Sequence, residues 1–198
     1  VLGHELGVEV IEPGDPVAGL KRGDRCAVEP YLNCGTCIAC RRGRPNCCTK
    51  LKVLGVHTDG GMRPLLTLPA HKLHPSAKLS YDQLALVETL GIGAHAVERA
   101  QLEAGEYVLV IGAGPIGLSV IQFALAAGAR VAVMDTSVVR LDFCRRQLGI
   151  DMLINAADPD ADAQIVAHGS GDLPTAVFDA TGNAASMAAA FKRPAHGG

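Results

Sequence analysis

The feature that most constrains this chain is the apolar stretch at residues 107–129, YVLVIGAGPIGLSVIQFALAAGA, which carries no charged side chain. Its length is close to the roughly 20 residues that a helix needs to cross the hydrocarbon core of a membrane. However, a short β-branched run at residues 107–111 is interrupted by Gly112, Gly114 and Pro115 before apolar residues resume. This pattern predicts a buried strand, a glycine turn and a helix, so we expect no membrane span.

The glycine turn has the sequence GAGPIG, with the G-x-G-x-x-G spacing of dinucleotide-binding units. Gly112 and Gly114 would permit the turn and the close approach of a pyrophosphate, while Gly117 would let the helix pack on the strand. The phosphates would meet the start of the helix at Pro115 and Ile116. Because the turn follows a predicted strand and opens a predicted helix, it indicates a nucleotide site.

An acidic residue at the end of the next predicted strand bears on which nucleotide is bound. The carboxylate of Asp135 could accept hydrogen bonds from the adenosine ribose hydroxyls, whereas a 2′-phosphate there would meet like charge. Arg140, five residues on, could instead reach such a phosphate. The pattern predicts NAD, and NADP stays open as the alternative.

Four of the seven cysteines lie in the segment CGTCIACRRGRPNCC. A C-x2-C-x2-C-x7-C spacing predicts a tetrahedral zinc site that is structural, because four thiolates leave no open position. An odd cysteine count weighs against the alternative of a disulfide knot. Cys47 could replace the last ligand, and Cys26 and Cys144 lie in apolar patterns typical of core residues. The predicted ligands are Cys34, Cys37, Cys40 and Cys48.

Composition narrows the class of protein. The chain of 198 residues is 48% hydrophobic and 19% charged, with a formal net charge of -2. This balance indicates neither a nucleic-acid partner nor a membrane partner, and we expect a cytoplasmic protein. The chain opens on VLGHELG without an initiator methionine and closes on FKRPAHGG, so we expect a fragment at both ends.

The order of three motifs, GHE at residues 3–5, the four cysteines and the glycine turn, resembles the zinc-containing medium-chain alcohol dehydrogenases. The resemblance includes GDRCAVEPY at residues 23–31 and VFDATGN at residues 177–183. It is closest to the polyol and sugar-acid branch, such as sorbitol- or galactonate-type dehydrogenases, through VETLGIGAHAVERA at residues 87–100.

The resemblance implies an α/β fold in two parts, both incomplete in this chain. Residues 1–90 would form part of a GroES-like β-rich catalytic domain, with the zinc lobe at residues 34–48. Residues 91–198 would form part of a Rossmann domain with a doubly wound parallel sheet. Periodicity places its strands near 107–111, 130–134, 152–154 and 175–179, and its helices near 115–127, 137–148, 160–168 and 183–191.

The resemblance also implies a catalytic zinc. His4 matches the histidine ligand, Glu5 the adjacent acid that is a ligand or an outer partner, and Glu88 the position where polyol dehydrogenases carry a glutamate. An exposed acid at a helix start is the alternative for Glu88, and a further cysteine ligand would fall before Val1. Thr181 joins Gly112, Gly114, Pro115, Ile116, Gly117, Asp135 and Arg140 as a predicted cofactor-binding residue.

Two departures from the family pattern concern the pocket. The glycine usual three residues after the GHE glutamate is displaced to Gly7, with Val8 in its place, and Glu88 is followed by Thr89 instead of proline. Two histidines, His57 in a predicted loop and His95 in a predicted helix, could face a substrate cleft or have ordinary structural roles.

The implied activity is hydride transfer from a secondary alcohol of a polyol or sugar acid to NAD, with zinc polarising the alcohol oxygen. The implied partners are a small-molecule alcohol and, when full length, further copies of the chain in a homo-oligomer. The alternatives are a threonine-dehydrogenase-like or simple alcohol dehydrogenase and a non-catalytic nucleotide-binding relative. We expect the fragment itself to be inactive.

Overall fold

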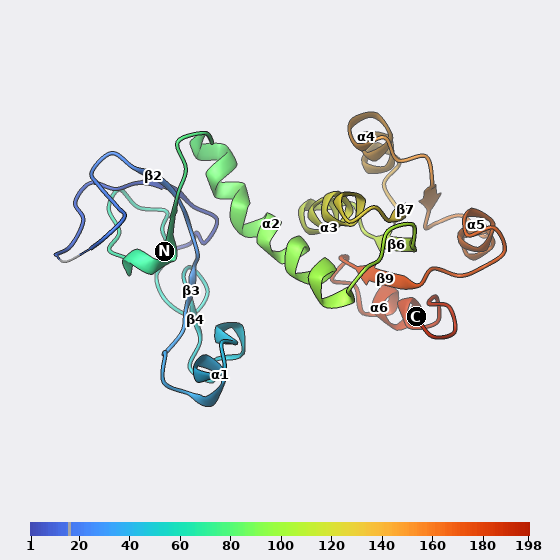
Figure 1. Cartoon of the computed structure of the whole chain (residues 1–198). Coiled ribbons are helices and arrows are strands. Elements are labelled where there is room, and N and C mark those ends of the chain that lie inside the picture. The colour runs from blue at the N-terminus through green and yellow to red at the C-terminus, as the bar shows by residue number, and fades with distance from the viewer. Residues whose placement is uncertain (16) are drawn as a thin grey trace. The chain divides into compact units, whose positions relative to one another are not determined.

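The computed structural model describes residues 1–15 and 17–198 (Figure 1). It divides into two compact units, Val1–Glu88 and Thr89–Gly198. The division falls inside helix α2 (Tyr81–Ala100), close to the boundary predicted between residues 90 and 91.

The first unit contains short antiparallel strands. β1 (Gly7–Glu9), β2 (Arg25–Val28) and β5 (Leu73–Pro75) form one sheet in the order β1-β2-β5, and β3 (Tyr31–Leu32) pairs with β4 (Lys52–Val53). The short helices are α1 (Ile38–Arg41), η1 (Pro45–Cys47) and η2 (Ala70–Lys72). Leu6, Val28 and Leu54 form a small core, and the partly buried residues packed against it are Val8, Leu32, Leu66, Leu68 and Leu73.

The second unit contains one parallel sheet with the strand order β8-β7-β6-β9. This is the 3-2-1-4 order of a doubly wound fold, and the predicted fold class is confirmed. The predicted strands and helices agree with the structure to within one residue at each end. The elements are β6 (Tyr107–Ile111), β7 (Arg130–Asp135), β8 (Leu153–Asn155), β9 (Ala176–Asp179), α3 (Pro115–Ala126), α4 (Val138–Leu148), α5 (Ala161–His168) and α6 (Ala184–Ala190).

The central strand β6 is buried on both faces of this sheet. Val108 and Val110 point into a cluster that includes Ile121 of α3, while the alternate residue Leu109 points into a cluster with Ile165 of α5. A strand covered by helices on both sides has no solvent-facing positions, which explains the continuous apolar run. Among the described residues, none of the helices combines the length and the hydropathy of a transmembrane segment.

One expectation about the first unit is wrong. The part expected to be β-rich includes residues 81–90, but these residues form the first half of α2. The helix starts at a capping box, because the Gln83 N–H donates to Ser80 Oγ at 3.2 Å and the Ser80 N–H donates to Gln83 Oε1 at 2.9 Å. The sequence SYDQ carries this start signal.

Candidate metal and cofactor sites

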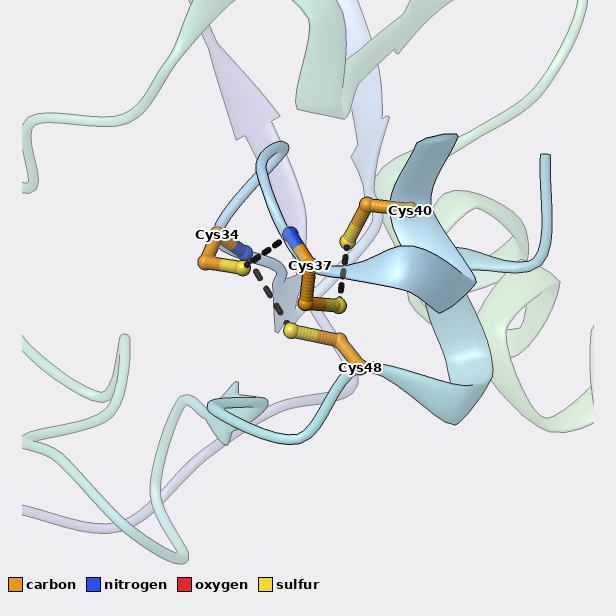
Figure 2. A group of neighbouring side chains, drawn as sticks. All are labelled: Cys34, Cys37, Cys40 and Cys48. Carbon is orange, nitrogen blue, oxygen red and sulfur yellow. Dashed lines mark hydrogen bonds between the residues drawn. The ribbon is translucent and has the colours of Figure 1, made fainter. Parts of the chain in front are cut away.

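The structure brings four of the cysteines together (Figure 2). The sulfur atoms of the cluster lie within 4.8 Å of one another. Four sulfurs bound to one zinc at 2.3 Å would stand about 3.8 Å apart, so the cluster fits this ion. Gly35 and Gly43 adopt positive φ angles of 72° and 71°, which lets the backbone loop around the sulfurs. The members are Cys34, Cys37, Cys40 and Cys48.

Backbone N–H groups point at these sulfurs. The Cys37 N–H donates to Cys34 Sγ at 3.4 Å, and the Cys34 N–H donates to Cys48 Sγ at 3.4 Å (Figure 2). The hydroxyl of Thr36, followed by backbone N–H groups, lowers the pKa of the Cys34 thiol to about 5. Donors aimed at sulfur favour the thiolate, which is the form that binds a metal.

The remaining cysteines stand outside the cluster. Cys47, the alternative for the last ligand, is exposed and is not among the four sulfurs. Cys26 and Cys144 are 0% exposed and lie in strand β2 and helix α4, as predicted for core residues. Burial raises the pKa of both thiols, which keeps them protonated in the core.

A second group of possible metal ligands combines His4, Glu5 and Glu88. One imidazole nitrogen and one oxygen from each carboxylate lie within 4.8 Å of one another. His4 and Glu5 precede strand β1, whereas Glu88 comes from α2. A nitrogen and two oxygens are ligands that zinc accepts.

A glycine-rich loop at residues 55–61 holds the GHE segment. The Gly60 N–H donates to the Val1 carbonyl at 2.8 Å, and the Gly61 N–H donates to the Gly3 carbonyl at 2.9 Å. A Cβ at Gly60 would lie 2.4 Å from the Gly3 oxygen, so a side chain there would push the two backbones apart. The positions of Gly60 and Gly61 in the sequence give no sign of this role.

Gly7, the displaced glycine of the family pattern, lies against the backbone of Tyr81. A Cβ at Gly7 would lie 2.3 Å from the carbonyl oxygen of Tyr81, at the first residue of α2. Gly7 therefore allows β1 to approach the start of the helix that carries Glu88. Thr89, which replaces the expected proline, is buried within the same helix.

Glu88 is not an exposed acid at a helix start. It is half-buried in the middle of α2, and its Oε1 accepts a hydrogen bond from the hydroxyl of Tyr31. Burial, and then this hydrogen bond, raise the pKa of the Tyr31 phenol, so the phenol remains a donor at neutral pH. Tyr31 lies in the quoted motif GDRCAVEPY, but its position in the sequence gives no sign of this partner.

The two histidines with open roles do not join the group of His4, Glu5 and Glu88. His57 is exposed and its Nδ1 accepts the Val53 N–H at 3.0 Å. His95 is exposed on α2, with Nδ1 3.9 Å from Glu98 Oε2. Each histidine therefore contacts a residue three or four positions away in the sequence, which fits an ordinary structural role.

The three glycines of the turn between β6 and α3 differ in backbone conformation and in the space around them. Gly112 has a φ of 94°, which favours glycine. A Cβ at Gly117 would lie 1.7 Å from the Gly112 oxygen, so this position packs the helix on the turn. At Gly114 a Cβ would meet no atom within 4 Å, which leaves open space at the N-terminus of α3, with Pro115 and Ile116 as its first residues.

Asp135 ends strand β7 beside this turn and is 6% exposed. Its Oδ2 accepts the Ala113 N–H at 2.7 Å, and its Oδ1 accepts the Ser137 N–H at 2.7 Å. Arg140 Nη1 lies 3.6 Å from Oδ2. The carboxylate thus connects the turn to the strand end, a role that the position of Asp135 in the sequence does not reveal.

Thr181 follows strand β9. Its N–H and its hydroxyl both donate to Asp179 Oδ1, at 2.9 and 2.6 Å. A Cβ at Gly112 would lie 3.2 Å from the Thr181 methyl carbon, so Thr181 borders the glycine turn. Turn, strand end and Thr181 therefore meet at the carboxyl edge of the sheet, where doubly wound folds bind their ligands.

Two models of known protein families match most of the chain. Residues 1–78 match the alcohol dehydrogenase GroES-like domain, and residues 115–198 match the zinc-binding dehydrogenase family. L-galactonate-5-dehydrogenase of Escherichia coli K12 is 44% identical over 198 residues, covering 100% of this chain and 58% of the relative. Sorbitol dehydrogenase of Bacillus subtilis is 33% identical over 202 residues, covering 100% of this chain and 57% of the relative.

A solved structure shares the fold. An alcohol dehydrogenase from Escherichia coli CFT073, crystallised with NADH, superposes with a TM-score of 0.90 at 31% identity, covering 100% of this chain and 58% of that chain. This chain thus spans somewhat more than half the length of the relatives that it matches. The two domain matches and the curated relatives show that the chain belongs to the zinc-containing medium-chain alcohol dehydrogenase family.

Proposed function

We propose that the protein is an NAD-dependent zinc dehydrogenase that oxidises a secondary alcohol of a polyol or sugar acid. The observation that carries this proposal is the convergence of ligand atoms of His4, Glu5 and Glu88 within 4.8 Å, from two separate segments of the first unit. The proposed substrate class rests on the similarity to L-galactonate-5-dehydrogenase and sorbitol dehydrogenase.

The two metal-ligand groups would serve different purposes. The four cysteines would hold a structural zinc, because a closed set of thiolates admits no substrate. The catalytic zinc would be held by His4, Glu5 and Glu88. When bound, it would act as a Lewis acid on the alcohol oxygen. His4 would bind as a neutral imidazole, and Glu5 would be either a ligand or a partner that orients it.

The second unit would bind NAD. The open space at Gly114 would accept the pyrophosphate at the start of α3, next to Gly112, Pro115, Ile116 and Gly117. Asp135 would accept the ribose hydroxyls with its remaining acceptor capacity, since a carboxylate offers about four lone-pair sites. Arg140 beside Asp135 and Thr181 beside the turn complete the proposed cofactor-binding set.

The other expectations stay predictions. These are the cytoplasmic location, the homo-oligomer of the full-length protein and the inactivity of the fragment. A threonine-dehydrogenase-like or simple alcohol dehydrogenase differs from the proposal in its substrate and not in its chemistry, so a substrate panel separates them. A non-catalytic relative would bind the nucleotide without any turnover.

His4→Ala in the full-length protein tests the proposed metal site. We expect turnover to be abolished while NADH binding, measured by fluorescence titration, is retained, because the proposed nucleotide residues lie in the other unit. His71→Ala is the matched control, since His71 is exposed in η2 and lies outside both ligand groups. Near-normal turnover in His4→Ala would rule out His4 as a ligand.

A further inference from the structure

Tyr31 connects strand β3 to the proposed catalytic ligands. Its hydroxyl donates to Oε1 of Glu88, although the two residues are 57 positions apart in the sequence. Glu88 carries three rotatable side-chain bonds, and it is the one member of its group that comes from α2. A fixed donor on a neighbouring strand can therefore restrict the orientation of this carboxylate.

The backbone around Tyr31 is held by the neighbouring segment at residues 52–54. Tyr31 pairs with Val53 and Leu32 pairs with Lys52 in the β3–β4 ladder. Pro30, directly before Tyr31, is fully buried, and its carbonyl accepts the Leu54 N–H at 3.1 Å. A donor mounted on such a segment has little freedom, which is what positioning another side chain requires.

The same segment continues directly into the cysteine cluster. Asn33, the residue after β3, donates from Nδ2 to Cys40 Sγ at 3.6 Å, and Cys34 follows next in the chain. Tyr31 therefore stands three residues from a proposed ligand of one metal while it contacts a proposed ligand of the other. An ordered cysteine cluster would hold the segment that presents the Tyr31 hydroxyl.

We propose that Tyr31 is a positioning residue of the catalytic metal site, which fixes the Glu88 carboxylate toward His4 and Glu5. The inference rests on the proposed function, because it requires that this group binds zinc. One hydrogen bond on Oε1 leaves acceptor capacity on the carboxylate for a metal. Loss of such an outer partner typically weakens metal affinity about 10- to 100-fold.

A second tyrosine–glutamate pair in the same unit provides the control. The Tyr81 hydroxyl donates to Glu9 Oε2 at 2.8 Å, and this exposed pair involves none of the proposed metal ligands. Tyr31→Phe and Tyr81→Phe each remove one hydroxyl and one hydrogen bond to a glutamate. The difference between the variants therefore isolates the effect of proximity to the metal site.

The test is a zinc titration of the full-length protein against a competing chelator, which yields one dissociation constant for each class of site. The class lost in Cys37→Ser belongs to the cysteine cluster. We expect Tyr31→Phe to raise the dissociation constant of the other class about tenfold. We expect Tyr81→Phe to leave both constants unchanged, and Tyr31→Phe to add nothing once Glu88→Ala is present.

Each alternative result has a distinct meaning. Equal zinc affinity in the wild-type protein and Tyr31→Phe overturns the positioning role and leaves the proposed function intact. Equal weakening in Tyr31→Phe and Tyr81→Phe, or loss of the cysteine-site zinc in Tyr31→Phe, also overturns it, because the hydroxyl would then serve the fold in general. A wild-type protein that binds zinc only at the cysteines contradicts the proposed function and removes the basis for the inference.

Discussion

At the scale of single residues, the sulfur atoms of Cys34, Cys37, Cys40 and Cys48 lie within 4.8 Å of one another, which is close enough for one metal ion to bind all four. Three cysteines separated by two residues each must lie on one tight loop, and the fourth follows within reach. Spacing alone could not choose between Cys47 and Cys48, because adjacent residues differ only in the direction of their side chains. In the structure Cys48 joins the cluster and Cys47 is exposed.

Cys37→Ser tests the cysteine cluster. Serine cannot supply a thiolate, so we expect the variant to lose about one zinc per chain and to unfold at a lower temperature, since structural zinc contributes folding free energy directly. Metal analysis and thermal unfolding measure these effects. Cys47→Ser is the control and should match the wild-type protein. Unchanged zinc content in Cys37→Ser would show that the cluster holds no metal.

Other roles at this scale depend on tertiary contacts that no local pattern reveals. The Tyr31 hydroxyl meets Glu88 only because β3 and α2 come together in the fold. Asp135 was predictable as an acid at a strand end, but its hydrogen bond from the Ala113 N–H depends on how the glycine turn folds back. A sequence motif locates such residues without naming their partners.

Asp135→Ala tests the cofactor assignment. We expect kcat/KM to fall for NAD and the preference for NAD over NADP to be lost, because the variant lacks the carboxylate that would accept the ribose hydroxyls and repel a 2′-phosphate. Steady-state kinetics with both cofactors measure this preference. Since Asp135 also accepts two backbone N–H groups, we expect lower thermal stability without any cofactor. A wild-type protein that prefers NADP, or a variant that keeps its NAD preference, would contradict the assignment.

At the scale of elements, the two units differed in how far the sequence could predict them. The parallel sheet was predictable because its strands are continuous apolar runs that alternate with helical periods between glycine breaks. The strands of the first unit are two to four residues long, too short for any period to develop. The start of α2 was missed although the capping pair of Ser80 and Gln83 marks it.

A pair of glycine variants separates folding from ligand approach in the turn before α3. Gly117→Ala places a methyl group 1.7 Å from the Gly112 oxygen, so we expect it to destabilise the protein by about 1–3 kcal/mol. Gly114→Ala adds a methyl group to open space, so we expect near wild-type stability with weaker NADH binding. Denaturant unfolding and fluorescence titration measure the two effects. Full NADH affinity in Gly114→Ala would argue against a pyrophosphate at this position.

At the scale of the whole molecule, the proposed chemistry is divided between the units. Both groups of proposed metal ligands lie in Val1–Glu88, and the glycine turn with Asp135 lies in Thr89–Gly198. Each proposed site can therefore be removed without deleting the other. The proposed activity requires both sites. Turnover is therefore the property that depends on the metal site and the nucleotide site together.

The most direct test is a substrate panel with the full-length protein, zinc and NAD, in which NADH formation is followed by its absorbance. The panel contains polyols, aldonates such as L-galactonate, L-threonine and simple alcohols. We expect the wild-type protein to show its highest kcat/KM with a polyol or an aldonate. We expect the His4→Ala variant to show no turnover with any substrate of the panel. A preference for L-threonine or a simple alcohol would contradict the proposed substrate class, and NADH binding without turnover on any substrate would contradict the proposed enzyme.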